Sequence, residues 1–203
     1  MSNLNFSIHP AAIVSSNRIG QGTRIWAFCN IQEKAVIGSD CNIGDHCFLE
    51  NNVTIGDRVT IKNGVSVWDG VIIEEDVFVG PNAVFTNDIY PRSKVYRDKP
   101  DKTVIRKGAT IGANATVIAG CTIGRYAFIG AGAVVTGDVP DFTLWYGNPA
   151  RQAGYVCMCA RQIVFDSTPM DSSNKTYCRC ACGLKYRLVD GYVLPEPNNS
   201  PEE

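Results

Sequence analysis

The sequence predicts an all-β protein, built as a parallel β-solenoid of about six coils. Three observations on the 203-residue chain support this fold. Apolar residues recur at every sixth position, small residues recur at a fixed offset from them, and the period is interrupted once before it ends. The interruption predicts one extruded loop, and the part beyond the end predicts a small cysteine-rich C-terminal extension.

The apolar period of six is the strongest of these observations. Every sixth residue is apolar from Ile13 to Phe85, and again from Ile105 to Val135. Neither the 3.6-residue period of a helix nor the two-residue alternation of a strand produces this pattern. Each hexapeptide is expected to form one short strand and one corner, so that three close a triangular coil of about 18 residues. Coils then stack at the strand spacing of about 4.8 Å.

The residue four positions after each periodic residue is small or medium-sized. We expect the large residue to fill the interior and the small one to lie where the chain turns. One coil cannot bury its own apolar face, so the stack of coils supplies the core. Gly, Asn and Asp near the corners are expected to adopt backbone conformations that β-branched residues resist. Four cysteines occupy the small position and are predicted to be reduced core thiols: Cys29, Cys41, Cys47 and Cys121.

This pattern resembles that of the hexapeptide-repeat acyltransferases over roughly residues 8–150. The resemblance implies a left-handed parallel β-helix; the period alone does not set the handedness. We expect three parts: the helix at 1–150 with its loop at 86–104, the cysteine-rich extension at 151–193, and a disordered tail at 194–203. Members of this family are trimers with sites between neighbouring solenoids, which implies a homotrimer here.

The extruded loop marks a candidate catalytic site. Solenoids carry such insertions on one face, and this is often the binding face. Residues 18 apart stack, so Asp69 is expected to lie beside Asn87 at the root of the loop. A cluster of carboxylates, an amide, an indole and an imidazole is typical of an active site, although a solvated row of polar turns has the same pattern. The other expected members of the cluster are Glu50, Trp68, Asp88 and His46.

The stretch KNGVSVWDGVIIEEDVFVGPNAVFTNDIYPRS, from Lys62 to Ser93, looks like the nucleotide-sugar N-acetyltransferases. The segments IRKGATIGANATVIAGCTIG and GNPARQ are similar as well. The resemblance implies acetylation of the 3-amino group of a dTDP- or UDP-linked 3-amino-3-deoxyhexose for surface polysaccharide (O-antigen or capsule). It assigns contact with the sugar amine to the Asn of FTN, Asn87. The nearby acidic residues are Asp69 and Asp88, and Arg92, Glu50 and Trp68 are candidate substrate contacts.

Acetyl transfer from a thioester to an amine needs a free lone pair, close approach and stabilisation of an oxyanion. A sugar amine needs only a modest base, so we expect direct attack in a ternary complex with acetyl-CoA. Asn87 and Asp69 position the amine, and Asp69, Asp88 or the departing thiolate takes the proton. His46 is the rival base. Candidate coenzyme A contacts are Ala113 and Ala131, which stack at one corner, and the basic residues Lys107, Arg125 and Arg151.

Five cysteines follow the end of the period, as C-M-C-A and then C-R-C-A-C-G. Two sulfur pairs separated by a loop predict a structural zinc ribbon or knuckle; free thiols and a disulfide are the alternatives. With four protein ligands such a site is closed rather than catalytic. Cys178 is an alternative to Cys180 in the expected ligand set, which is Cys157, Cys159, Cys180 and Cys182.

Composition and charge exclude other classes. The 19 Lys+Arg against 20 Asp+Glu exclude a strongly basic nucleic-acid binder. No apolar run is long enough to span a membrane, and the first ten residues do not resemble a signal peptide, so the cytoplasm is expected. Two histidines are too few for the three-histidine zinc carbonic anhydrase of this fold. Two alternatives stay open: an O-acetyltransferase with His46 as base, and a non-catalytic solenoid scaffold.

Overall fold

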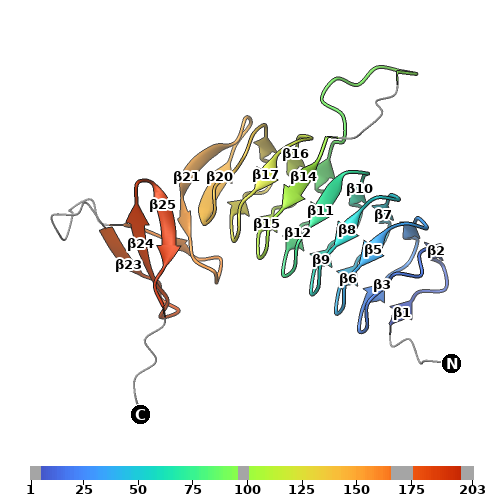
Figure 1. Ribbon diagram of the computed structural model, residues 1–203, viewed down its shortest axis with the longest axis horizontal. Helices are drawn as coiled ribbons and strands as arrows, with labels where there is room; N and C mark the ends of the chain where they lie inside the picture. Colours follow the sequence, from blue (N-terminus) through green and yellow to red (C-terminus); the bar gives the residue numbers. More distant parts are fainter. Residues whose placement is uncertain (1–5, 96–100, 166–175, 198–203) are drawn as a thin grey trace, which may run out of the picture.

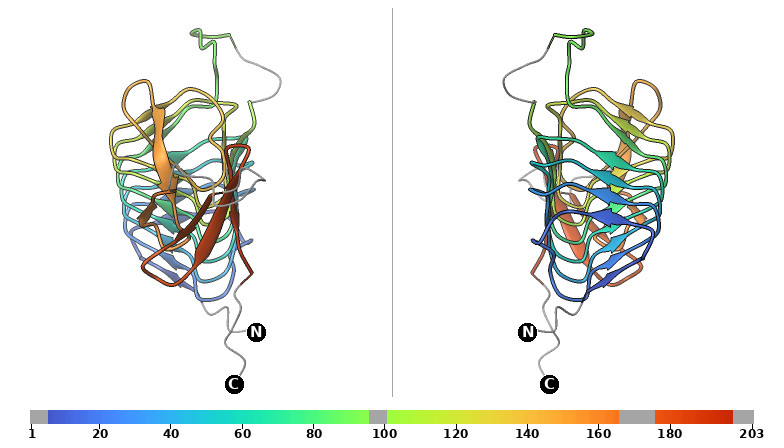
Figure 2. Two further views of the ribbon diagram at one scale, coloured as in Figure 1. Left: turned by 90° about the vertical axis from the view of Figure 1, so that its left-hand side faces the viewer. Right: turned by 90° about the vertical axis from the view of Figure 1, so that its right-hand side faces the viewer.

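The structure is a computed structural model that describes residues 6–95, 101–165 and 176–197. Within these residues every regular element is a β-strand, and no described helix is long and apolar enough to cross a membrane. Most strands belong to three parallel sheets, which form the walls of a solenoid (Figure 1). The end-on views of Figure 2 show these walls around one continuous interior.

The three walls are named sheets A, B and C, and each is given in spatial order. Sheet A contains β1 (Ser7–Ile8), β3 (Arg24–Ile25), β6 (Asn42–Ile43), β9 (Thr60–Ile61), β12 (Phe78–Val79), β15 (Thr110–Ile111), β18 (Phe128–Ile129), β20 (Thr143–Tyr146), β21 (Arg151–Val156) and β22 (Gln162–Ile163). Sheet B contains β2 (Ile13–Val14), β4 (Asn30–Ile31), β7 (Phe48–Leu49), β10 (Ser66–Val67), β13 (Val84–Phe85), β16 (Thr116–Val117) and β19 (Val134–Val135). Sheet C contains β5 (Val36–Ile37), β8 (Thr54–Ile55), β11 (Val71–Ile73), β14 (Thr103–Ile105) and β17 (Thr122–Ile123).

The pairing register confirms the predicted coil length. Arg24 pairs with Asn42, so these successive coils are 18 residues apart. The first coil is one residue shorter, because Val14 rather than Ile13 pairs with Ile31. The sequence predicts Ile13 in the interior, and this prediction is wrong: Ile13 is 65% exposed, since the interior position of its strand belongs to Val14.

The solenoid has slightly more turns than the sequence predicts. Sheet B contains seven strands, against a prediction of about six coils. Stacking already begins at β1, which pairs with β3 ahead of the first periodic residue. It also continues past Val135, because Val139 pairs with Ile123 and β20 pairs with β18. The stack therefore extends by part of a coil at each end.

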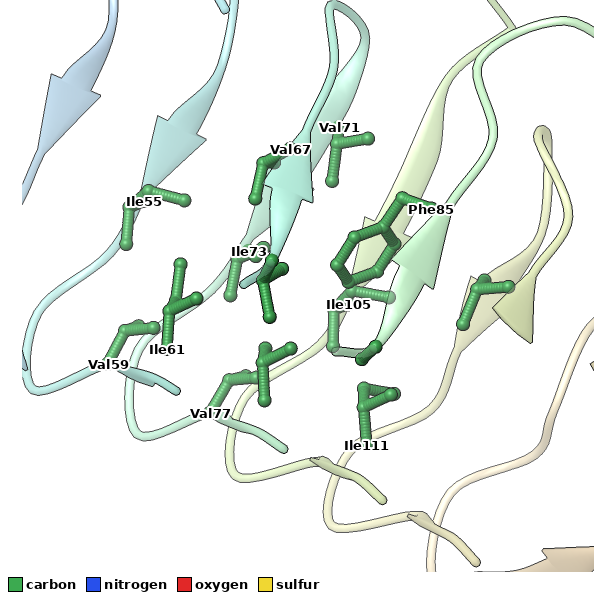
Figure 3. Packing of buried hydrophobic residues seen from close by; sticks show 14 of the residues in the cluster. Ile55, Val59, Ile61, Val67, Val71, Ile73, Val77, Phe85, Ile105 and Ile111 are labelled. Carbon is green, nitrogen blue, oxygen red and sulfur yellow. The ribbon is translucent and has the colours of Figure 1, made fainter. Parts of the chain in front are cut away.

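The core is a stack of buried aliphatic side chains, as predicted (Figure 3). Large residues such as Ile61, Phe85 and Ile105 are at most 1% exposed, and small ones such as Ala109 fill the space beside them. Each fully buried side chain of this size contributes about 1.5–3 kcal/mol relative to exposure. The predicted core thiols are confirmed, since all four are free and buried: Cys29, Cys41, Cys47 and Cys121.

The corners use two kinds of residue for two reasons. The third residue after each buried periodic residue commonly has a positive φ, as at Asp40, Asn82 and Gly70, which confirms the expected left-handed corners. The glycine directly after a periodic residue has a different role. A Cβ on Gly112 would lie 2.5 Å from the backbone nitrogen of Ala131, so this glycine is required by close approach of the next coil.

The extruded loop leaves the solenoid between β13 and β14, at the corner that joins sheet B to sheet C. It projects away from the stack in all three views (Figures 1 and 2). Regular pairing resumes at Thr103, two residues before the predicted resumption at Ile105. Residues 96–100 of the predicted loop lie outside the described residues.

The C-terminal part covers one end of the solenoid. β21 and β22 extend sheet A in antiparallel fashion. The following strands, β23 (Thr176–Arg179), β24 (Lys185–Val189) and β25 (Tyr192–Pro195), form a separate antiparallel sheet, here called the cap sheet. β25 enters the segment predicted as a disordered tail, because its register with β24 continues to Pro195. Residues 198–203 of that tail lie outside the described residues.

Candidate functional site

A ladder of side-chain hydrogen bonds runs along the corner between sheets B and C. Asp69 Oδ1 accepts a hydrogen bond from the Asn52 backbone N–H at 2.7 Å, and its Oδ2 accepts one from Asn52 Nδ2 at 2.8 Å. Glu50 Oε2 accepts the Asp69 N–H at 2.8 Å. One coil earlier, Asn51 Oδ1 accepts the Lys34 N–H at 3.2 Å. Both oxygens of Asp69 are therefore engaged in holding the turn of the preceding coil.

Asn87 follows β13 at the same offset as Asp69 follows β10, but it does not continue the ladder. Within the described residues its side chain makes no hydrogen bond, and it is half-buried. The neighbouring bonds are supplied by threonines instead: Thr86 Oγ1 accepts the Ala119 N–H at 2.9 Å, and Thr103 Oγ1 accepts the Gly120 N–H at 3.0 Å. In the part of the chain that the structure describes, the amide of Asn87 therefore has no hydrogen-bond partner at the root of the loop.

The first residues of the loop are held by Asp88. Its Oδ1 accepts the Tyr90 backbone N–H at 2.8 Å. Tyr90 itself is 73% exposed. Arg92 forms an isolated antiparallel β-bridge with Val95 through its backbone. Its side chain is exposed, and Nη1 donates a hydrogen bond to the Pro91 carbonyl at 3.0 Å. The loop root therefore presents an amide, an aromatic ring and a guanidinium on one projecting segment.

Trp68 and His46 lie in different surroundings. Trp68 directly follows β10, packs on the core and contacts Phe48 with ring centroids 5.3 Å apart. His46 lies at the corner between sheets A and B, where it is exposed, has φ 59° and stacks on Phe28 at 4.9 Å. His46 thus precedes the strands of sheet B, whereas Asn87 follows them. Within a single chain, His46 therefore does not lie at the root of the loop, although the sequence predicts that it belongs to the same cluster.

The predicted coenzyme A contacts lie at two corners and at the start of β21. Ala113 and Ala131 stack at the corner between sheets A and B, where the Gly132 N–H donates to the Ala113 carbonyl at 2.8 Å. Lys107 and Arg125 lie at the corner between sheets C and A. Arg151, at the start of β21, is exposed and donates to the Ala150 carbonyl.

The basic residues of the corner between sheets C and A are paired with carboxylates. Lys107 Nζ lies 3.2 Å from Glu75 Oε1, and Arg125 Nε lies 2.8 Å from Asp141 Oδ2. The Glu75 carboxylate raises the pKa of Lys107 through a hydrogen bond and its charge. This corner is therefore a row of ion pairs rather than a free basic patch.

A groove of about 740 Å³ lies beside these ion pairs. One wall is the last coils of the solenoid, with Lys107 and Arg125, and the other is β25, with Tyr192 and Leu194. The groove is on a different corner from Asn87. Sequence reasoning missed it because its second wall depends on how the cap sheet folds back, for which the hexapeptide period carries no signal.

The structure brings four cysteines of the C-terminal part together. Their sulfur atoms all lie within 4.8 Å of one another, and Cys178 is not among them. Burial raises the pKa of Cys157 to about 12. The Leu184 backbone N–H and the Cys157 thiol lower the pKa of Cys182 to about 7. This grouping matches the set favoured from the sequence: Cys157, Cys159, Cys180 and Cys182.

Comparison with known proteins gives concordant matches. The family described as bacterial transferase hexapeptide (six repeats) matches residues 18–51, 52–87 and 102–137. The chain is 56% identical over 186 residues to a dTDP-3-amino-3,6-dideoxy-alpha-D-galactopyranose 3-N-acetyltransferase from Aneurinibacillus thermoaerophilus. That alignment covers 92% of this chain and 93% of the relative. The family matches leave out the part of the extruded loop from 88 to 101.

Solved structures match at lower sequence identity. The acetyltransferase domain of PglB from Neisseria gonorrhoeae FA1090 has a TM-score of 0.52 and 25% identity over 73% of this chain. This chain spans 58% of that protein's length. A hexapeptide-repeat acetyltransferase from Vibrio cholerae O1 biovar eltor, complexed with acetyl coenzyme A, has a TM-score of 0.50 and 28% identity. The alignment covers 57% of this chain and 67% of that one.

Proposed function

The chain belongs to the bacterial hexapeptide transferase family, and on this premise we propose that it is an acetyl-CoA-dependent N-acetyltransferase. Its substrate is the 3-amino group of a dTDP-linked 3-amino-3,6-dideoxyhexose, destined for surface polysaccharide. The supporting observation is the 56% identity to the Aneurinibacillus enzyme over 92% of this chain. Of the two nucleotides open from the sequence, dTDP is favoured because the relative's substrate carries it.

The reaction is direct attack in a ternary complex. The lone pair of the sugar amine forms a bond to the thioester carbonyl carbon, the carbon–sulfur bond breaks, and coenzyme A leaves as its thiolate. The amine loses one proton, which passes to the thiolate directly or through water. Most of the rate enhancement then comes from orientation of the amine and stabilisation of the oxyanion.

Asn87 is the residue assigned to orient the amine. Its amide is half-buried at the loop root and makes no hydrogen bond within the described residues, so its carbonyl oxygen is available to an N–H donor. Asp69 lies at the same position one coil before Asn87, where both of its oxygens already accept hydrogen bonds from Asn52. Asp69 is therefore assigned to hold the turn beside the site rather than to act as the base, and the thiolate of coenzyme A is the final proton acceptor.

A homotrimer places exposed apolar residues of sheet B and its edge in an interface. Ile13 is 65% exposed, Phe28 60% and Val84 47%, and such an interface would cover them. In such an assembly each chain's corner between sheets A and B, with Ala113 and Ala131, faces a neighbouring chain. The pantetheine arm lies along that corner, and the site is completed between two chains.

Coenzyme A phosphates require basic partners. Lys107 and Arg125 fill this role only by exchanging their ion pairs with Glu75 and Asp141 for phosphate, whereas Arg151 has no carboxylate partner within the described residues. Arg151 is therefore the favoured contact. Because acetyl-CoA and nucleotide sugars are cytoplasmic metabolites, the enzyme is placed in the cytoplasm.

The test of the reaction is thiol release from acetyl-CoA with a matched acceptor panel. The panel contains a dTDP-linked 3-amino-3,6-dideoxyhexose, the same amino sugar linked to UDP, and the dTDP sugar with a hydroxyl in place of the amine. We expect turnover with the dTDP amino sugar and formation of its amide by mass spectrometry. Turnover with the hydroxyl sugar instead would assign O-acetyl transfer to the protein. No turnover with any acceptor would favour a non-catalytic scaffold.

The test of the site compares two asparagines of the same corner. Asn87→Ala is expected to lower kcat/KM by about 10²-fold, because the amine loses its orienting contact. Asn51 lies two coils before Asn87. Asn51→Ala removes its hydrogen bonds to Lys34 and Gln32 and serves as the matched control, with activity retained. His46→Gln is expected to leave the pH profile of kcat unchanged. Retained activity in Asn87→Ala, or loss of the acid-side limb of the kcat profile in His46→Gln, would overturn this assignment.

A further inference from the structure

Two tight turns of the C-terminal part have the same covalent pattern and the same hydrogen bonds. Each contains cysteine, any residue, cysteine, and then a small residue in a left-handed conformation. The first turn is 157–161, where Ala160 has φ 65°, and the second is 180–184, where Gly183 has φ 97°. They are called here the first and second cysteine turns.

The hydrogen bonds of the two turns correspond one to one. In the first turn, the Cys157 N–H donates to the Arg161 carbonyl at 2.9 Å, and the Ala160 N–H donates to the Cys157 carbonyl at 2.9 Å. In the second, the Cys180 N–H donates to the Leu184 carbonyl at 2.8 Å, and the Gly183 N–H donates to the Cys180 carbonyl at 2.9 Å. Two segments about 20 residues apart thus present paired sulfurs in the same way.

The sulfur atoms of the two turns meet in one cluster. Cys157 Sγ lies 3.4 Å from Cys182 Sγ, and Cys159 Sγ lies 3.6 Å from Cys180 Sγ, while no pair in the cluster exceeds 4.8 Å. Tetrahedral Zn²⁺ with Zn–S bonds of about 2.3 Å holds its four sulfurs about 3.8 Å apart. The cluster therefore has the size and the ligand number of a tetrathiolate zinc site.

A buried tyrosine next to the cluster fits sulfur in its deprotonated form. The Tyr186 hydroxyl is fully buried and lies 3.0 Å from Cys157 Sγ. The same oxygen accepts the Met158 N–H at 3.0 Å. Because the hydroxyl acts as acceptor toward Met158, its single proton is available for donation to Cys157 Sγ. A hydrogen-bond donor fixed on a ligand sulfur is typical of the surroundings of metal thiolates.

The cap sheet shares only a small core with the end of the solenoid. This core contains six buried residues, and two of the six are cysteines of the cluster: Phe142, Cys157, Ile163, Cys180, Tyr186 and Val193. Small units with so few apolar residues commonly depend on a metal or on disulfides. The first cysteine turn connects β21 to β22 in sheet A, and the second connects β23 to β24 in the cap sheet, so one ion bound between them joins the two sheets.

We propose that Cys157, Cys159, Cys180 and Cys182 bind one Zn²⁺ per chain as a closed tetrathiolate that fastens the cap sheet to the solenoid. Binding releases the four thiol protons to water and forms four Zn–S bonds, with no change of oxidation state. The site is structural, since four protein ligands leave no position for substrate. Its consequence is the position of β25, which forms one wall of the groove beside Lys107 and Arg125.

The experiment measures the metal content of the purified full-length chain by inductively coupled plasma mass spectrometry. We expect one zinc per chain in the wild type and in Cys178→Ser, and little zinc in Cys182→Ser. Cys178 is the matched control because it lies in the cap sheet outside the cluster. Zinc retained by Cys182→Ser, or a zinc-free wild type whose intact mass shows two disulfides, would overturn the proposal.

Two further measurements keep the proposal testable if Cys182→Ser does not fold. Replacement of zinc by Co²⁺ in the wild type is expected to give the visible and near-ultraviolet bands of tetrahedral cobalt thiolate. Bands of octahedral cobalt would contradict it. Tyr186→Phe is expected to weaken zinc retention against a competing chelator by about 10–100-fold, with the zinc stoichiometry at excess metal unchanged. An unchanged affinity would remove Tyr186 from the site.

Discussion

The solenoid and the cap sheet reach stability by opposite means. In the solenoid each coil pairs with the coil before and after it, and the buried stack runs without a break from Ile19 to Ala150. The cap sheet has three antiparallel strands, and the small core that joins it to the solenoid contains Tyr186 of β24 and Phe142 of the last solenoid corner. The solenoid is therefore expected to tolerate a local defect, whereas the cap sheet depends on a few individual contacts.

The largest expected effect falls on the contact that joins the two regions. Phe142 comes from the last solenoid corner, is 4% exposed, stacks on Tyr126 at 5.3 Å and tilts against Tyr186 at 5.8 Å. Phe142→Ala is expected to destabilise the cap sheet by about 3–5 kcal/mol, since a large buried ring is lost. Hydrogen exchange measured by mass spectrometry is expected to show faster exchange in residues 176–197 and little change before Phe142.

Tryptophan fluorescence provides a second readout for the same variant. All three tryptophans, Trp26, Trp68 and Trp145, lie in the solenoid. The denaturant concentration at the midpoint of unfolding, followed by tryptophan fluorescence and here called the tryptophan midpoint, is expected to stay near the wild-type value in Phe142→Ala. Phe78→Ala is the control, because Phe78 is a solenoid phenylalanine with 40% of its surface exposed. If the tryptophan midpoint falls together with the protection of the cap sheet, the two regions unfold as one unit and the comparison fails.

A smaller effect is expected from a defect inside the solenoid. Gly112→Ala places a Cβ 2.5 Å from the Ala131 nitrogen and 2.6 Å from the Gly130 carbonyl carbon, both backbone atoms of the next coil. Separating two coils enough to fit this methyl group is expected to cost about 1–3 kcal/mol, measured as a lower tryptophan midpoint in denaturant.

Gly137 offers the matched control for this substitution. A Cβ on Gly137 meets nothing within 4 Å, and its φ is not in the left-handed region, so Gly137→Ala is expected to be close to neutral. Both positions lie in the last coils of the solenoid. Equal stability of the two variants would show that close stacking of coils is not what selects glycine after a periodic residue.

The sequence predicted the solenoid well because one physical rule is repeated in every coil. An interior position needs an apolar side chain, and the period reports that position many times over. Where the rule is applied only once, prediction fails. The first coil is one residue short, so Ile13 was assigned the place of Val14. Glycines near the corners are predicted from backbone conformation, whereas those directly after periodic residues are explained by packing against the next coil.

The candidate site was predicted in part for a related reason. The 18-residue coil places Asp69 and Asn87 in one column, and this follows from counting alone. Which of the two has a free side chain does not follow, because that depends on where the chain leaves the solenoid. The same limit applies to Lys107 and Arg125: their type indicated phosphate contacts, but their carboxylate partners come from other coils. The groove depends on the cap sheet and has no periodic signal.

The smallest expected effect concerns the charged corners of the solenoid. Arg58 Nε lies 2.6 Å from Asp76 Oδ1, and its hydrogen bond and charge lower the pKa of Asp76. A carboxyl whose folded pKa is depressed adds stability above its unfolded pKa, near 3.8, and loses it as the pH falls through the folded value. Asp76→Asn is therefore expected to lower the tryptophan midpoint slightly at pH 7, and by less still as the pH falls below about 4.

Asp40→Asn is the control for this comparison. Asp40 occupies the same corner and the same left-handed position as Asp76, with φ 56° and 62°, but makes no ion pair within the described residues. Added salt is expected to reduce the Asp76→Asn effect, because an exposed pair is screened, and to leave Asp40→Asn unchanged. A pH-independent loss in Asp76→Asn would mean that the corner is held by the shape of the turn.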